Sequence, residues 1–277
     1  MIERLKPERL DKILSNSGCG SRSDVKKLIH SGAVACDGIV IKDPDIKFVA
    51  ETTRIDICGS PLRYSKYVYI MMHKPKGVIS ASYDDRLKTV ADLLPERCRS
   101  RGLFPVGRLD IDTTGLLLLT DDGALAHSLL SPKKHIEKEY EALLDKPPGA
   151  EAVEGFERGV VLNGDLKLQP AKLLISSDSN FTATEAAMSA TAAPAAISIP
   201  TPSTPAASTI MSATAARVVI TEGKFHQIKR MFAVYGIKVL ELKRVRMGAL
   251  ELDPRLAPGE SRELSEHELA AAFEFFE

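Results

Sequence analysis

Residues 107–120 constrain the fold more than any other stretch of this 277-residue chain. The segment opens with the turn-rich sequence GRLDIDTTG and ends with the apolar sequence LLLLT. A short apolar run bounded by turn residues is typical of a buried strand. The sequence therefore predicts a charged turn, carrying Arg108 and Asp110, that leads directly into a buried strand.

The charges of the chain are segregated. Lys and Arg number 37, as do Asp and Glu, so the formal net charge is zero. Residues 1–66 nevertheless carry a net charge of +3, residues 217–247 carry +6 and residues 248–277 carry −6. Local basic clusters are typical of nucleic-acid binding, although ordinary solvated faces would give the same count. If RNA is the partner, we expect the basic residues of 1–30 and 217–247 to share one side.

Length and composition narrow the class of protein. A chain of this length has room for about two domains, and its 44% apolar content is that of a soluble globular protein. No apolar run approaches the roughly 18 residues of a membrane span, and the N-terminal sequence lacks a signal-peptide core, so a cytoplasmic protein is expected. The four widely spaced cysteines predict neither a zinc site nor a disulfide framework.

Residues 1–66 are expected to form two short helices and a hairpin. Pro7 suits a first helical turn, and Ser21 begins a cap-rich start to the second helix. Asp37-Gly38 is a favoured two-residue hairpin turn. One apolar face of the first helix is formed by Leu10, Ile13 and Leu14.

The order of cap, helix and hairpin over residues 7–53 resembles the S4 RNA-binding domain. This resemblance implies that the second helix and the adjoining loops lie on an RNA backbone. Basic side chains at a helix start can bind phosphates with salt-dependent, weakly sequence-specific affinity. The candidate RNA-binding residues of this helix are Arg22, Lys26 and Lys27.

A second domain, residues 67–277, is expected to alternate strands and helices. Residues 176–216 interrupt it: Ala, Ser, Thr and Pro make up most of this segment, which predicts a flexible insertion. The flanking pieces 172–175 and 217–220 are expected to pair as strands. The glutamate-rich C-terminal tail is interpreted as a solvated helix face. One apolar helical face is predicted at Phe225, Ile228, Met231, Phe232 and Tyr235.

Three interpretations compete for residues 107–123. A calcium loop would need a Glu at its twelfth position, where Asp121 stands, and a helix after the loop. An aspartyl phosphatase would use Asp110, Asp112 and Thr114 as an Asp-x-Asp-x-Thr motif with magnesium. That motif normally opens its domain, whereas here a whole segment precedes it.

The third interpretation is that the chain resembles the pseudouridine synthases, in the branch that carries an S4 domain and modifies single sites in ribosomal RNA. The matching segments occur in the order of that family, and they read HKPKGVISA at 73–81, GRLDIDTTGLLLLTDDG at 107–123, KEY at 138–140 and EGKFHQIKRMF at 222–232. The resemblance implies isomerisation of uridine to pseudouridine, most closely in the small (16S) subunit. The large-subunit (23S) branch stays open, as does a non-catalytic RNA-binding assembly factor.

The resemblance also assigns roles to residues. Asp110 would be the catalytic carboxylate, which either attacks C1′ or removes the C2′ proton. Tyr140 would stack on the extruded uracil and help to move the C5 proton. Lys229 would be the basic partner that keeps Asp110 ionised, with Arg230 as the alternative. Arg108 would contact a phosphate or fill the space that the flipped base leaves. Ile220 would form the floor of the uracil pocket.

The fold expected from these observations is α+β, with an S4 module at 1–66 followed by a catalytic domain built on a mixed, mostly antiparallel sheet flanked by helices. Neither a metal nor a cofactor is required by the reaction. The expected partner is ribosomal RNA, with no membrane, and a monomer is expected. Further candidate residues for an RNA groove are Lys74, Lys76, His226, Lys243, Arg244 and Arg246.

Overall fold

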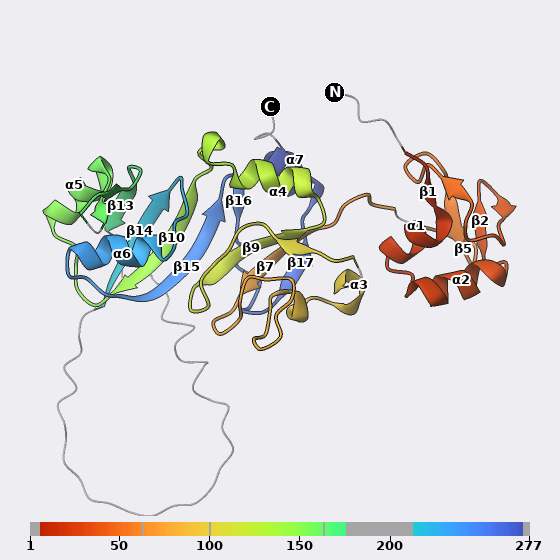
Figure 1. Cartoon of the computed structure of the whole chain (residues 1–277), viewed down its shortest axis with the longest axis horizontal. Coiled ribbons are helices and arrows are strands. Elements are labelled where there is room, and N and C mark those ends of the chain that lie inside the picture. The colour runs from red at the N-terminus through yellow and green to blue at the C-terminus, as the bar shows by residue number, and fades with distance from the viewer. Residues whose placement is uncertain (1–5, 63, 100, 163, 176–212, 274–277) are drawn as a thin grey trace, which may run out of the picture. The chain divides into compact units, whose positions relative to one another are not determined.

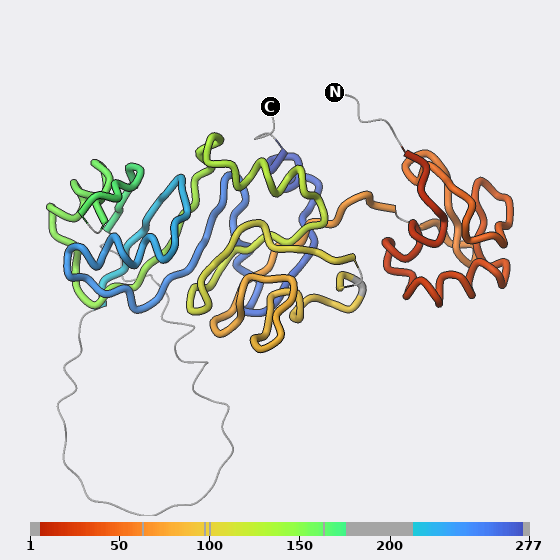
Figure 2. Tube along the Cα trace, in the orientation of Figure 1, coloured from red at the N-terminus to blue at the C-terminus, as the bar shows by residue number. Residues whose placement is uncertain are grey.

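The structure is a computed structural model that describes residues 6–62, 64–99, 101–162, 164–175 and 213–273 (Figures 1 and 2). It divides into two compact units, Met1–Lys134 with Ala249–Glu277 and His135–Gly248. Helices and strands alternate in both units, which confirms the α+β class. In the described ranges no helix has the length and apolar content to cross a membrane.

The N-terminal part of the first unit is a small module with two helices, α1 (Leu10–Asn16) and α2 (Arg22–His30). Its core is formed by side chains from both helices and from the strands that follow, such as Leu10, Val25 and Ile55. The strands of the module are β1 (Glu8–Arg9), β2 (Val34–Cys36), β3 (Ile39–Val40), β4 (Lys47–Phe48), β5 (Ile55–Ile57) and β6 (Ser60–Pro61). Strand β1 pairs with β4, and the order of the other four is β3-β2-β5-β6.

Local sequence signals account for most of this module. The Ser21 hydroxyl caps α2 by accepting a hydrogen bond from the Asp24 amide at 3.3 Å, as its position predicts. Asp37 and Gly38 both have positive φ, 48° and 81°, as the hairpin turn between β2 and β3 requires. The prediction for Pro7 was wrong, because the next two residues form strand β1 and the first helix begins only at Leu10.

The rest of the first unit is built around β7 (Tyr69–Lys74) and β9 (Thr114–Thr120), which pair antiparallel along their length. Strand β17 (Ser261–Glu263) pairs with the other edge of β7, and β8 (Phe104–Pro105) pairs with β9. The four leucines of β9 are fully buried, which confirms the predicted strand. The remaining elements are η1 (Ala91–Leu93), α3 (Glu96–Arg99), α4 (Gly123–Leu130), η2 (Pro132–Lys134), β16 (Leu250–Glu251) and α7 (Glu266–Phe273).

The second unit contains four antiparallel strands in the order β13-β14-β10-β15. Their bounds are β10 (Lys138–Leu144), β13 (Lys172–Ile175), β14 (Thr214–Ile220) and β15 (Val239–Met247). The unit also holds α5 (Ala150–Arg158), α6 (Gln227–Val234) and the small pair β11 (Val161–Leu162) and β12 (Leu166–Lys167). Helix α5 packs on α6 through Phe156 and Phe232, whose ring centroids are 5.0 Å apart.

Two features of the second unit bear on the sequence predictions. Strands β13 and β14 do pair, so the pieces that flank the low-complexity segment join as expected. The predicted end of that insertion was three residues too late, because Thr214–Ala216 already belong to β14 and Ala216 is buried. Residues 176–212 of the segment lie outside the described residues.

The acidic tail is more than a solvated helix face. Glu268 of α7 forms a capping box with Ser265, whose amide and hydroxyl both donate to its carboxylate at 2.8 Å. Arg262 donates to the other oxygen of Glu268 at 2.6 Å and also to Asp253 at 2.7 Å. The bond from Arg262 is the main reason why the pKa of Glu268 is lowered to about 2.

This pKa predicts an acid-sensitive contribution to stability. A glutamate with a lowered folded-state pKa stabilises the fold fully above its unfolded value of 4.5, and this is lost as the pH falls through about 2. We expect Glu268→Gln to lower the melting temperature at pH 7, and this deficit to shrink between pH 5 and 2. Thermal unfolding measures it, with Glu266→Gln on the same helix as the control. A deficit that stays constant down to pH 2 would contradict the prediction.

Candidate active site

Asp110 lies on a tight turn immediately before β9. Its carbonyl accepts a hydrogen bond from the Thr113 amide at 3.1 Å, which closes the turn. The turn begins at Gly107, where φ is +81° and where a methyl group would come within 2.8 Å of Leu130. Asp110 is half-buried and its neighbour Arg108 is exposed. The turn therefore presents a charged pair at the end of a rigid strand.

A buried lysine holds this turn. Lys74, at the end of β7, has none of its surface exposed. Its ammonium donates to the carbonyls of Thr113 at 2.9 Å and of Asp110 and Pro75 at 3.0 Å each. A buried ammonium must be hydrogen-bonded to be tolerated, so the turn and the lysine fix one another. Lys74 is thus a scaffold residue, and its prediction as an RNA-groove residue was wrong.

The segment after β7 adds three further hydrogen bonds to the turn. The Gly77 amide donates to the Ile111 carbonyl at 2.8 Å. The Ser80 hydroxyl donates to the Leu109 carbonyl and accepts from the Leu109 amide, both at 3.0 Å. The sequence HKPKGVISA therefore supports the backbone on both sides of Asp110.

The acidic residues at the far end of β9 are structural. Asp122 caps α4 by accepting from the Ala124 amide at 3.0 Å, and it also accepts from the Tyr69 hydroxyl at 2.9 Å. Burial and that bond raise the pKa of Tyr69. A calcium loop is excluded because a strand, not a helix, follows the turn. Within the described ranges, no group of three or more His, Cys, Asp or Glu could hold a metal ion.

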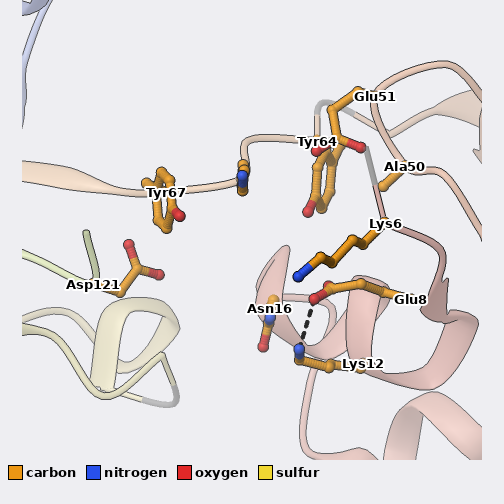
Figure 3. A pocket seen from close by; sticks show the side chains of 10 residues that line it. Lys6, Glu8, Lys12, Asn16, Ala50, Glu51, Tyr64, Tyr67 and Asp121 are labelled. Carbon is orange, nitrogen blue, oxygen red and sulfur yellow. Dashed lines mark hydrogen bonds and ion pairs between the residues drawn. The ribbon is translucent and has the colours of Figure 1, made fainter. Parts of the chain in front are cut away.

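Asp121 takes part in a second polar cluster. It pairs with the buried guanidinium of Arg101 at 2.7 Å and accepts from the Val68 amide at 2.7 Å. Arg101 also donates to the carbonyls of Asn16 and Lys66, each at 2.7 Å. A nearby pocket of about 270 Å³ is shown in Figure 3, and it contains none of the predicted site residues. Its lining residues are Lys6, Glu8, Lys12, Asn16, Ala50, Glu51, Tyr64, Lys66, Tyr67 and Asp121.

Tyr140 is the third residue of β10 in the second unit. It is only 7% exposed, and it lies opposite Val218 of β14 and Arg244 of β15 in the sheet register. A bulge between Glu139 and Tyr140 shifts the pairing with β15, because Glu139 lies opposite Arg246. Bulges of this kind re-aim side chains next to active sites.

Two arginines of β15 have different surroundings on either side of this bulge. Arg244 is only 2% exposed. The pKa of Lys138 is lowered, first by the burial of Lys138 itself and then by the nearby positive charge of Arg244. Arg246 donates to Glu139 at 3.0 Å and to Glu137 at 3.2 Å. Both arginines were predicted to line an RNA groove. Arg244 is instead buried, and the charge of Arg246 is neutralised by Glu137 and Glu139.

Helix α6 presents Lys229 and Arg230, both half-exposed, beside a buried face. That face consists of Ile228, Met231 and Phe232, which confirms this part of the predicted core. The prediction for Phe225 was wrong: it is 72% exposed because it lies before the helix, which begins at Gln227. Ile220, at the end of β14, is buried and suited to line a pocket floor.

The predicted site residues are divided between the units. Asp110 and Arg108 belong to the first unit, whereas Tyr140, Ile220, Lys229 and Arg230 belong to the second. Their meeting at one active site stays a prediction, as does a shared RNA-facing side. The predicted RNA-binding residues of α2, namely Arg22, Lys26 and Lys27, are all exposed.

Comparison with known proteins decides the family. Residues 68–234 match the model of the RNA pseudouridylate synthase family, and residues 8–48 match the S4 domain. The chain belongs to the RNA pseudouridine synthases. Its catalytic class is therefore that of an isomerase acting on RNA, and the N-terminal module of helices α1 and α2 is an S4 domain.

Individual relatives span nearly the whole chain. An uncharacterised RNA pseudouridine synthase of Bacillus subtilis (strain 168) is 44% identical over 94% of this chain and 96% of its own. The ribosomal small subunit pseudouridine synthase A of Vibrio cholerae is 37% identical over 95% and 98%. A crystal structure of a pseudouridylate synthase is 30% identical, with a TM-score of 0.59, and the alignment covers 95% of this chain and 99% of that one.

The residues that support Asp110 were not found from the sequence. The segment containing Lys74, Gly77 and Ser80 matched the family, but its role became apparent only from the hydrogen bonds to the turn. Lysine is rarely buried, so a sequence gives no reason to place one inside. The turn-rich sequence at 75–77 was the one local sign that the backbone bends here.

Ser80 offers a test of this support. We expect Ser80→Ala to lower kcat about ten- to a hundred-fold with little change in KM, because the turn that carries Asp110 loses both bonds at Leu109. Steady-state kinetics of pseudouridine formation over a range of RNA concentrations measure both constants. The matched control is Ser82→Ala, which removes a bond to Leu103 instead. Equal effects of both substitutions would contradict the positioning role.

Proposed function

We propose that this enzyme converts uridine to pseudouridine in the ribosomal RNA of the small subunit. The observation that carries the proposal is the 37% identity, over 95% of this chain, to an enzyme named ribosomal small subunit pseudouridine synthase A. An S4 domain in front of the catalytic residues fits an RNA substrate, because exposed basic side chains on α2 can bind phosphates.

The proposed reaction is an intramolecular rearrangement. The C1′–N1 bond of the uridine breaks, the uracil turns, and a C1′–C5 bond forms. The proton on C5 leaves and N1 gains one, so atoms and charge balance without a redox step. The target base must first be extruded from its stack, at a cost of a few kcal/mol. Contacts to flanking phosphates offset this cost.

Asp110 is proposed as the residue that starts the reaction. Its half-buried position on a turn braced by Lys74 and Ser80 provides the rigid placement that a nucleophile or a base needs. Its carboxylate either attacks C1′ or removes the C2′ proton. Both routes need the ionised form, so both are lost in Asp110→Asn.

Two residues of the second unit are proposed as its partners. The buried ring of Tyr140 would stack on the extruded uracil, and its hydroxyl would help to move the C5 proton. Lys229 would supply the cation that keeps Asp110 ionised, and Arg230 follows it on the same half-exposed part of α6. Ile220 would form the floor of the base pocket, and Arg108 would contact the RNA.

Pseudouridine mapping of ribosomal RNA tests the function and Asp110 together. In a strain lacking the gene we expect one small-subunit site to lose its mark, and wild type to restore it. Asp110→Asn should restore none, a loss of about a thousand-fold or more. The matched control is Asp112→Asn, an exposed carboxylate on the same turn, which should restore the mark.

The possible outcomes separate the parts of the proposal. If every pseudouridine of ribosomal RNA persists in the deletion strain, the substrate assignment is wrong. A lost large-subunit site would move the assignment to that subunit. If Asp110→Asn restores the mark, the catalytic role is wrong. Magnesium-dependent phosphatase activity that Asp110→Asn abolishes would favour the Asp-x-Asp-x-Thr chemistry instead.

The S4 module yields a separate prediction. Replacing Arg22, Lys26 and Lys27 by Gln should weaken RNA binding and reduce the slope of log Kd against log salt by up to about 2, since each lost phosphate contact removes about 0.7. Fluorescence anisotropy at several salt concentrations measures the slope. The control is Arg54→Gln, because Arg54 is already paired with Asp56 at 3.1 Å. An unchanged slope in the triple variant would refute this binding role.

A further inference from the structure

The loop before α6 exposes a large aromatic side chain that nothing in the catalytic assignment uses. Phe225 is 72% exposed, whereas Ile228, Met231 and Phe232 of α6 are buried. An exposed phenyl ring gives up the favourable free energy of burial. A polar side chain at this position would avoid that cost, so the exposed ring calls for an explanation.

The loop is held rigidly rather than left loose. Gln227 is only 4% exposed, and its side-chain oxygen Oε1 accepts a hydrogen bond from the Lys224 backbone amide at 2.9 Å. Its amide group donates to Glu222 at 3.1 Å, and Glu222 also accepts from the Gln169 amide at 2.9 Å. The buried side-chain amide of Gln227 thus bonds to the loop backbone at Lys224. Through Glu222 it also connects the loop to the segment that contains Gln169. Phe225 is therefore exposed on a loop whose conformation is fixed by hydrogen bonds.

His226 completes the arrangement. Its ring stacks on that of Phe225, with centroids 3.8 Å apart and planes at 19°. Its backbone has φ +49°, in the left-handed region that a non-glycine residue adopts at some cost. That backbone also starts α6, since the His226 carbonyl accepts from the Arg230 amide at 2.9 Å. Backbone conformations of this kind cluster at functional sites.

We propose that the stacked rings of Phe225 and His226 form a platform for an unpaired base of the substrate RNA, adjacent to the uridine that is modified. The inference rests on the proposed RNA substrate and deepens it. Aromatic rings bind unpaired bases by stacking, whatever the base, because every base has a flat π-face.

The charge around the rings favours RNA over an apolar protein partner. Lys224 precedes the rings, and Lys229 and Arg230 follow within one turn of α6. The segment 217–247 carries a net charge of +6. A flat aromatic surface beside several cations suits a nucleotide, which offers a π-face and a phosphate together. The platform also lies four residues before Lys229, so it would position the RNA close to the reacting base.

Binding to a fluorescein-labelled oligo(U) of about 12 nucleotides tests the platform. The measurements use the full-length chain in the Asp110→Asn background, so that no turnover occurs. We expect Phe225→Leu to raise Kd about five- to fifty-fold and Phe225→Trp to keep the wild-type value. His226→Gly, which removes the second ring and suits the left-handed backbone, should also raise Kd. The matched control is Val234→Ala, an exposed apolar residue at the other end of α6.

A second probe separates stacking from electrostatic contact. An abasic strand of the same length keeps the phosphates and lacks the bases, so Phe225→Leu should not alter its Kd. The slope of log Kd against log salt should be unchanged, because no charge is removed. Equal losses on both strands, or no loss on oligo(U), would overturn the platform. Retained pseudouridine formation in ribosomal RNA would show that the proposed function stands even then.

Discussion

The buried ammonium of Lys74 is the interaction on which the geometry around Asp110 depends. An ammonium inside a protein must find acceptors, and here these are the carbonyls of the turn that carries Asp110. The turn at Asp110 is thereby restrained, because its displacement would leave the buried charge of Lys74 without hydrogen-bond acceptors, at a large cost in free energy. Ser80 and Gly77 add directional contacts on either side. A rigid turn at the end of a buried strand is the placement that the proposed attack on a ribose carbon, or the proposed removal of a ribose proton, requires.

Sequence patterns predicted most of the local elements because their causes are local. The Asp37-Gly38 turn, the Ser21 cap and the leucines of β9 each follow from backbone conformation or periodicity within a few residues. Phe225 was assigned to the core because its spacing fits the helix periodicity, but the helix starts two residues later. Periodicity cannot locate a helix start that has a left-handed residue at its cap and no side-chain cap.

The candidate site shows the same division between local and distant causes. Asp110, Tyr140 and Lys229 could be named because they lie in recognisable segments of the chain. The supporting roles of Lys74 and Ser80 could not, since each depends on contacts with residues about 30 to 40 positions away. The buried Arg244 was mistaken for a surface residue for a related reason. Its neighbour two positions on, Arg246, pairs with Glu137 and Glu139, and the sequence offers no means of telling the two arginines apart.

The bulge in the pairing of β10 with β15 explains how that difference arises. In a regular strand, residues two positions apart point to the same face and share their surroundings. The register shift between Glu139 and Tyr140 breaks this rule, so one arginine is buried opposite Tyr140 while the other joins an accessible group of carboxylates. The chain can therefore vary its surface charge at position 246 without disturbing the buried cation at 244. A single extra residue in one strand thus lets the exposed face and the buried face of that strand be altered independently.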